Sequence, residues 1–150
     1  GFLPTDKKER AAILEQLRAE TRTIIMYEAP HHLRGTLKEL YENLGDRRIT
    51  FCRELTKRFE SVMPMSLAEG MAYYEENQPK REYVLVMEGR SMQSIREEKQ
   101  QAWEEMRIEE HMEYYLSKGL DKKAAMKEVA RDRNVSKRDI YNYLLENAKD

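Results

Sequence analysis

Two short stretches of the chain contain the side chains whose types and spacing could do chemistry. Residues 27–33 include Glu28 and His31, and residues 53–60 carry alternating basic and acidic side chains. Arginine and lysine can neutralise phosphate, and a carboxylate, or a lysine with a lowered pKa, can accept the proton of a hydroxyl group. Each stretch follows an apolar run that predicts a strand, and open α/β sheets bind ligands at strand ends. We therefore expect a binding or catalytic site there, with a structural salt-bridge cluster as the alternative.

The sequence predicts no metal site. His31 and His32 are adjacent and so point in different directions, and His111 is expected on a polar helix. There is no glycine-rich phosphate loop and no Ser-His-Asp order. The single cysteine, Cys52, cannot form an internal disulfide and is expected to be a buried core thiol. This cysteine usage fits a cytoplasmic location.

Helix and strand signals alternate over residues 1–90 and predict an α/β fold with a mixed, at least partly parallel sheet flanked by helices. The expected elements are a helix that begins at Thr5 or Asp6, further helices at residues 33–44 and 66–77, and strands at residues 23–28, 48–54, 61–65 and 81–88. The run at 23–28 favours burial on both faces, and Pro64 favours an edge position for its strand. Residues 1–4 have the pattern of a strand tail, so we expect a fragment of a longer protein.

Residues 91–150 carry helix signals only, which predicts a second region made of helices. A long charged helix is expected over residues 94–118, a second helix over 121–133, and a third that Ser136 caps. The last two helices resemble a helix-turn-helix. The alternative is a plain helical hairpin that covers hydrophobic surface.

The near-neutral net charge of −1 hides an uneven charge distribution. Residues 91–117 contain seven acids and three bases, whereas residues 118–138 contain eight bases and three acids. A basic face on the helical tail could contact nucleic acid, or it could be an ordinary solvated face. No apolar run approaches the roughly 20 residues that a membrane helix requires.

Several motifs stand together in a recognisable order and spacing. They are residues 1–4, 23–31, 45–47, 53–57 with Glu60, 82–86 with Glu88 and Gly89, and in the tail residues 122–125, 129–130 and 135–141. In this arrangement the chain resembles ribosomal RNA small subunit methyltransferase I, a family in the tetrapyrrole-methylase-like class of S-adenosylmethionine (SAM) enzymes. The resemblance covers nearly the whole chain and corresponds to the C-terminal half of the family's enzymes.

The resemblance implies the C-terminal α/β domain of a two-domain methyltransferase (residues 1–90), followed by a helical tail (residues 91–150). The family's enzymes hold SAM between two α/β domains and methylate a ribose 2′-hydroxyl of a cytidine in small-subunit (16S) rRNA. The implied partners are this rRNA or the ribosomal subunit and a second copy in a homodimer, with no membrane. Because the first domain with its SAM loop is absent, the fragment alone is expected to be inactive.

The resemblance also implies roles for particular residues. The expected catalytic residues are Lys57, Glu54 and Arg53. The expected cofactor-binding residues are Tyr27, Glu28, Leu55, Thr56, Met87 and Glu88. The expected RNA-binding residues are His31, Lys57, Lys122, Lys123, Lys127, Lys137 and Arg138. The family usually has arginine where this chain has His32, which replaces a permanent cation by one that titrates near neutral pH.

Two alternative functions remain open at this point. A tetrapyrrole C-methyltransferase of the precorrin or uroporphyrinogen type would share the α/β part but would lack the basic helical tail. A helix-turn-helix binding module would explain the tail but not the motif at residues 53–57.

Overall fold

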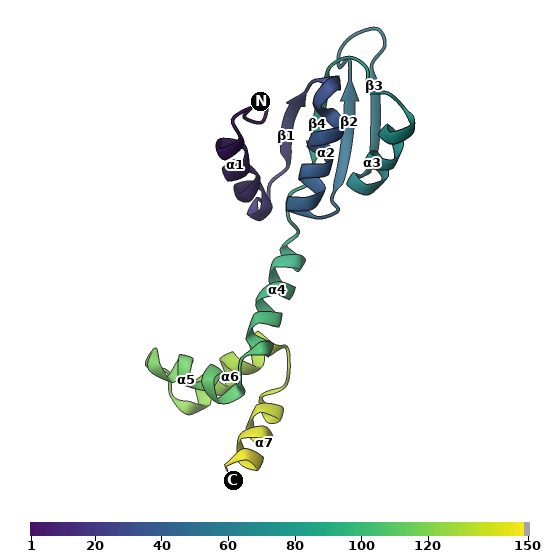
Figure 1. Ribbon diagram of the computed structural model, residues 1–150. Helices are drawn as coiled ribbons and strands as arrows, with labels where there is room; N and C mark the ends of the chain where they lie inside the picture. Colours follow the sequence, from purple (N-terminus) through teal and green to yellow (C-terminus); the bar gives the residue numbers. More distant parts are fainter. Residues whose placement is uncertain (149–150) are drawn as a thin grey trace. The chain divides into compact units, whose positions relative to one another are not determined.

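Alternating apolar residues form a four-stranded sheet in the first of two units, Gly1–Ser91. The computed structural model describes residues 1–148. The strands are β1 (Ile24–Glu28), β2 (Arg48–Arg53), β3 (Ser61–Ser66) and β4 (Tyr83–Met87). Their order across the sheet is β1-β4-β2-β3, so β1 and β3 are the edge strands (Figure 1). The predicted edge position of the strand that contains Pro64 is therefore confirmed.

The pairing of the strands differs from the predicted one. β1 and β2 run in the same direction and are connected by α2 (Pro30–Leu44), but β4 lies between them and pairs antiparallel with both. β3 is also antiparallel to β2. The predicted α/β class with flanking helices is confirmed, whereas parallel pairing is limited to one isolated bridge between Phe2 and Tyr27. Sequence order could not reveal the insertion of β4, because neighbours along the chain are not always neighbours in a sheet.

Three helices of this unit pack on one face of the sheet. They are α1 (Lys7–Ala19), α2 and α3 (Leu67–Glu76). The Asp6 carboxylate caps α1 by accepting hydrogen bonds from two backbone N–H groups, and Gly45, with a φ of 79°, ends α2. Leucines of α2 that are fully shielded from solvent join a core with alternate residues of the strands. This core fixes the strands and therefore the loops that leave them.

The opposite face of the sheet is not covered by these helices. Along β1 buried and exposed residues alternate, and Ile25 is 58% exposed. The prediction that residues 23–28 are buried on both faces is therefore wrong. The physical reason is that the helices of the unit pack on one side only, and an antiparallel sheet can leave its second face open.

The second unit begins at Met92 and is helical, as predicted. Its helices are α4 (Met92–Glu105), α5 (Ile108–Ser117), α6 (Lys122–Arg133) and α7 (Lys137–Asn147). The prediction of one helix over residues 94–118 is wrong, because the chain is extended at Arg107 between α4 and α5. Side-chain contacts explain the break: Arg133 donates a hydrogen bond to the Met106 carbonyl, and the Trp103 ring stacks on the His111 ring at a centroid distance of 4.1 Å.

The predicted boundaries of the last two helices are confirmed. Asn134 adopts a left-handed conformation and ends α6, and Ser136 and Asp139 form a capping box that starts α7. A small apolar core that includes Met112, Val129 and Ile140 holds α5, α6 and α7 together. Among the described residues, no helix combines the length and hydropathy needed to cross a membrane.

Candidate functional site

The two predicted chemical stretches lie close together at one end of the strands. Glu28, at the end of β1, and Arg53, at the end of β2, are both paired with Tyr83, at the start of β4. We call this end of the strands the Tyr83 edge; the name refers to the strand ends and not to the edge strands β1 and β3. Met87 lies at the opposite end, where it pairs with Ile24 of β1 and Ile49 of β2, and Glu88 follows it. The structure therefore separates these two predicted cofactor residues from the others, because β4 runs antiparallel to its neighbours.

The loop that follows β2 has an unusual backbone conformation. Glu54 and Thr56 have positive φ angles of 52° and 67°, and Arg81, which precedes β4 at the same edge, has a φ of 67°. Only one other non-glycine residue among those described, Asn134, has a positive φ. Such conformations cost about 1–3 kcal/mol each and concentrate at functional sites, where the surrounding structure enforces them.

Hydrogen bonds within the loop explain how it keeps this conformation. The Lys57 N–H donates to the Glu54 carbonyl at 3.0 Å, and the Glu60 N–H donates to the Lys57 carbonyl at 3.2 Å. The Glu60 carboxylate accepts from the Thr56 N–H at 3.2 Å. Glu60 is thus a structural residue of the loop, and it presents the side chains of Glu54 and Lys57 in a defined arrangement.

Glu54 and Lys57 form an ion pair with unequal exposure. The Lys57 Nζ lies 3.4 Å from the Glu54 Oε2, and the side chains are 64% and 9% exposed, respectively. The Arg81 Nη1 lies 3.9 Å from the same oxygen. The carboxylate is therefore fixed between two cations, whereas the ammonium is accessible to a ligand in solution. This geometry can orient a hydroxyl or phosphate group beside a proton acceptor.

A small hollow of about 180 Å³ lies beside this ion pair. The residues that line it are Phe2, Tyr27, Glu54, Leu55, Lys57, Glu82, Tyr83 and Val84. Tyr27 from the first stretch therefore lies around the same hollow as Glu54, Leu55 and Lys57 from the second. The other four lining residues, Phe2, Glu82, Tyr83 and Val84, were not predicted as site residues. Phe2 contacts Tyr27 edge to face at a centroid distance of 5.6 Å.

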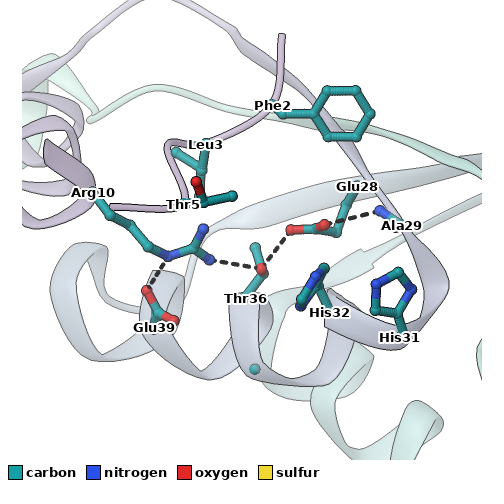
Figure 2. A pocket seen from close by; sticks show the side chains of 11 residues that line it. Phe2, Leu3, Thr5, Arg10, Glu28, Ala29, His31, His32, Thr36 and Glu39 are labelled. Atoms are coloured by element: carbon teal, nitrogen blue, oxygen red, sulfur yellow. Dashed lines mark hydrogen bonds and ion pairs between the residues drawn. The ribbon is translucent and has the colours of Figure 1, made fainter. Parts of the chain in front are cut away.

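A larger pocket of about 510 Å³ lies beside α2 (Figure 2). The buried Glu28 carboxylate accepts hydrogen bonds from the Ala29 N–H at 2.8 Å and from the Thr36 hydroxyl at 2.5 Å. Arg10 donates to the Thr36 hydroxyl at 2.9 Å and to the Glu39 carboxylate at 2.7 Å. Both carboxylates therefore have partners within the protein, and this network links α1, β1 and α2.

The sheet separates the two pockets, because adjacent residues of a strand point to opposite faces. Glu28 lies on the face that the helices cover, whereas Tyr27 lies on the open face. His31 and His32 line the larger pocket, and their ring centroids are 4.1 Å apart, so the expectation that these neighbouring side chains point in different directions is wrong. Phe2 lines both pockets. Arg53 lines neither, so of the predicted catalytic residues the structure brings together Glu54 and Lys57.

Cys52 is buried, as predicted, and burial is the main cause that raises the pKa of its thiol. A raised pKa disfavours the reactive thiolate at neutral pH. Within residues 1–148, no three His, Cys, Asp or Glu side chains are grouped as metal ligands could be. The groups present around the hollow at the Tyr83 edge include the carboxylates of Glu54 and Glu82, the Lys57 ammonium and the rings of Phe2, Tyr27 and Tyr83.

The helical unit contains a buried polar cluster that the sequence did not indicate. His111, expected on a polar helix, is fully buried; its Nε2 lies 3.0 Å from the Asp132 carboxylate and its Nδ1 accepts from Arg133 at 3.0 Å. Tyr115 donates to the same carboxylate. Burial is the main cause that lowers the pKa of His111, and the Arg133 charge adds to this effect. The neutral His111 imidazole therefore links the Asp132 carboxylate to the Arg133 guanidinium inside this unit, which is a structural role.

The predicted RNA-binding residues of the tail lie on α6 and α7. Lys122, Lys123, Lys127 and Arg138 are exposed, and Lys137 is half-buried. In the described part of the chain, none of the five forms an ion pair. Their positive charge is therefore available to a polyanion.

The fold and the site define an α/β protein with a constrained, charged loop at one sheet edge and a separate helical unit with basic helices. No protein-family model matches the chain. The chain is 44% identical over 142 residues to ribosomal RNA small subunit methyltransferase I of Bacillus subtilis. The aligned region covers 95% of this chain and 48% of that protein. It is 41% identical to the protein of the same name from Halalkalibacterium halodurans, with the same coverage.

A third relative of that name, from Synechocystis sp., is 36% identical over 97% of this chain and 51% of its own length. These similarities confirm the resemblance that the motifs indicated, which is to the C-terminal part of proteins named ribosomal RNA small subunit methyltransferase I. The chain spans about half the length of the curated relatives it matches.

Proposed function

We propose that this chain is the C-terminal part of a SAM-dependent methyltransferase that modifies a ribose 2′-hydroxyl of a cytidine in small-subunit rRNA. The names of the relatives support an rRNA methyltransferase. The structural observation that carries the proposal is the ion pair between Lys57 and Glu54 beside a hollow at the Tyr83 edge. The ribose hydroxyl and the cytidine are taken from the resemblance of the motifs.

The reaction explains why these two residue types are needed. When bound, SAM supplies a methyl group on a positively charged sulfur; the C–S bond breaks as the C–O bond to the ribose forms. The ribose hydroxyl must lose its proton in this step, and the Glu54 carboxylate is the proposed acceptor. Lys57 enters the ion pair as an ammonium, which donates hydrogen bonds, so its proposed role is to orient the hydroxyl or a neighbouring phosphate.

The residues present fit part of the cofactor. The hollow of about 180 Å³ is smaller than the roughly 300–1,000 Å³ of a complete ligand site. Tyr27 and Leu55, which line the hollow, are therefore proposed to hold one portion of SAM. Thr56 follows Leu55 in the loop without lining the hollow, and its proposed cofactor role rests on the resemblance alone. The remainder of SAM would contact a region that the relatives have outside the matched half. Glu28 would contribute only indirectly, since its carboxylate already has two partners. Met87 and Glu88 have no role in this proposal.

The basic residues of α6 and α7 are proposed to bind rRNA through its phosphates. Five cationic side chains without ion pairs in the described residues support this role. Phosphate contact positions the protein without reading sequence, so the choice of nucleotide would be made elsewhere. His31 lines the larger pocket and remains a proposed RNA contact there. A homodimer in the cytoplasm is also proposed, on the resemblance alone.

The test uses the full-length Bacillus subtilis relative, because this chain spans only about half of it. The purified protein would be incubated with methyl-labelled SAM and either small-subunit rRNA or a tetrapyrrole. We expect label in the RNA, and digestion to nucleosides followed by mass spectrometry should place it on the ribose of a cytidine. Label on a tetrapyrrole carbon would support the first alternative function. Tight RNA binding without any methyl transfer would support the binding-module alternative.

A further inference from the structure

The loop between β2 and β3 carries an aromatic side chain that the proposed chemistry does not use. Phe59 is 67% exposed, more than any other large apolar side chain of residues 1–148. Every residue from Leu55 to Glu60 is exposed, and Figure 1 shows this loop projecting beyond the ends of the strands. A single exposed apolar residue is common on protein surfaces, so the surroundings of Phe59 decide whether it has a function.

Positive charge accompanies the Phe59 ring. The guanidinium carbon of Arg58 lies 5.5 Å from the centroid of the ring, which is a cation–π contact. Lys57, two residues before Phe59, is the exposed member of the ion pair with Glu54. An exposed ring beside cations is the combination that binds single-stranded nucleic acid, because a base stacks on the ring while the cations attract phosphate.

The backbone on both sides of Phe59 is held by hydrogen bonds. The Glu60 N–H donates to the Lys57 carbonyl at 3.2 Å, and the Glu60 carboxylate accepts from the Thr56 N–H at 3.2 Å. These bonds close the loop around residues 57–59. A ring whose backbone is already fixed loses less conformational entropy when a ligand stacks on it, so this loop is suited to presenting Phe59 to a partner.

Phe59 lies next to the proposed site without belonging to it. Leu55 and Lys57 line the hollow at the Tyr83 edge, whereas Phe59 does not. Two residues of extended chain span at most about 7 Å, so the Phe59 backbone lies within that distance of Lys57. A base that stacks on Phe59 therefore belongs to a nucleotide close to the one whose ribose Lys57 would orient.

We propose that Phe59 stacks on an unpaired base of the rRNA beside the target nucleotide. The base is unpaired because stacked neighbours cover both faces of a base within a helix, whereas bases of single-stranded segments are free to stack on aromatic side chains. This inference rests on the proposed rRNA substrate. It adds a contact to a base, whereas the basic residues of α6 and α7 are proposed to contact phosphate alone.

The test replaces Phe59 by three different side chains. Phe59→Ala removes the ring, Phe59→Leu keeps an apolar side chain without a ring, and Phe59→Tyr keeps the ring. Tyr41→Ala is the matched control, since Tyr41 is an exposed aromatic residue near the end of α2 that is away from the Tyr83 edge. In this chain the Phe59 variants should keep the melting temperature within about 3 °C, because exposed side chains contribute little to stability.

The same changes are made at the aligned positions of the full-length Bacillus subtilis relative, and rRNA binding and methylation are measured. We expect alanine and leucine at the Phe59 position to weaken rRNA binding about 5–150-fold, the usual effect of losing one stacked base. The salt dependence should not change, because stacking releases no counterions. Tyrosine should restore the affinity to within about threefold of the parent. KM for rRNA should rise with the loss of affinity while kcat stays within about threefold, since stacking acts on binding and not on the transfer step.

Other results would overturn the proposal. Leucine that binds rRNA as well as tyrosine would show that Phe59 packs on an apolar protein surface. A flatter salt dependence in the alanine variant would assign the loss to phosphate contacts. If the parent methylates rRNA and all three variants match the control, only the stacking is refuted. If the parent neither binds nor methylates rRNA, the proposed function is refuted together with this inference.

Discussion

Glu54 and Lys57 form an ion pair in which the carboxylate is shielded and the ammonium is open to solvent, with 3.4 Å between Nζ and Oε2. Exposed lysine–glutamate pairs contribute little to stability. This pair differs because a loop with two left-handed residues holds it next to a hollow. The arrangement therefore supports the proposed role of this pair in orienting a ligand.

Thr36→Val should destabilise the first unit by about 1–3 kcal/mol. The buried Thr36 hydroxyl donates to Glu28 and accepts from Arg10, so valine would leave both charged groups short of a partner. Urea unfolding monitored by circular dichroism measures the change. Thr5→Val, at an exposed position, should stay within about 0.5 kcal/mol of the parent. Equal stability of the two variants would contradict the role of this network.

Gly89→Ala should destabilise the chain by at least about 1–3 kcal/mol, the usual cost of overpacking. A Cβ at Gly89 would overlap the backbone of Thr21 and Arg22, which cannot move aside as a flexible side chain could. Gly35→Ala is the matched control on α2, where a Cβ would meet nothing within 4 Å. Alanine in a helix interior should stabilise by up to about 1 kcal/mol. Thermal melts of the two variants should therefore shift in opposite directions, and shifts in the same direction would count against this packing.

The stability of the helical unit should fall as the pH drops from 7.5 to 5.5. The lowered pKa of His111 keeps the folded imidazole neutral, whereas the unfolded chain takes up a proton near a pKa of about 6.5. Because the unfolded state then binds more protons, stability rises with pH across this window and is lost on acidification. Hydrogen exchange of α5 and α6 amides measures the effect. The pH dependence should persist in the control variant His32→Gln, which removes an exposed histidine. If the pH dependence disappeared in this variant, it would arise from His32 and not from His111.

Replacement of Lys137 and Arg138 by alanine should weaken rRNA binding mainly at low salt. Each lost phosphate contact lowers the slope of log affinity against log salt by about 0.7–0.9, so the double variant should lose about 1.5 from the slope. Titration of the chain with small-subunit rRNA fragments at several salt concentrations provides the slope. An unchanged affinity and slope would assign these residues to an ordinary solvated face.

Much of the fold could be predicted because its signals are local. Caps at Asp6 and Ser136 and the stop at Gly45 gave correct helix ends, since each satisfies backbone groups within one turn. The position of β4 between β1 and β2 could not be predicted, because it depends on contacts distant in sequence. For the same reason Met87 was expected near Tyr27, although the antiparallel register places them at opposite ends of the sheet.

The site was predicted to the extent that it follows from the motif at residues 53–57. The loop places Glu54 and Lys57 together, but Arg53 belongs to β2 and lines neither pocket. His111 was missed because its burial depends on Trp103 and Asp132, which reach it from two other helices. Single-sequence patterns do not report such contacts.

The central claim is that Lys57 orients the group that receives the methyl. The most direct measurement compares the rate of rRNA methylation and the affinity for rRNA in the full-length Bacillus subtilis relative with alanine at the position aligned with Lys57. The control is alanine at the position aligned with Lys38, which in this chain is similarly exposed and lies 4.0 Å from Glu42 on α2. We predict a loss of about 10²–10⁴ in methylation rate, with rRNA affinity within about threefold, only for the Lys57 position. A methylation rate equal to that of the control would contradict the claim.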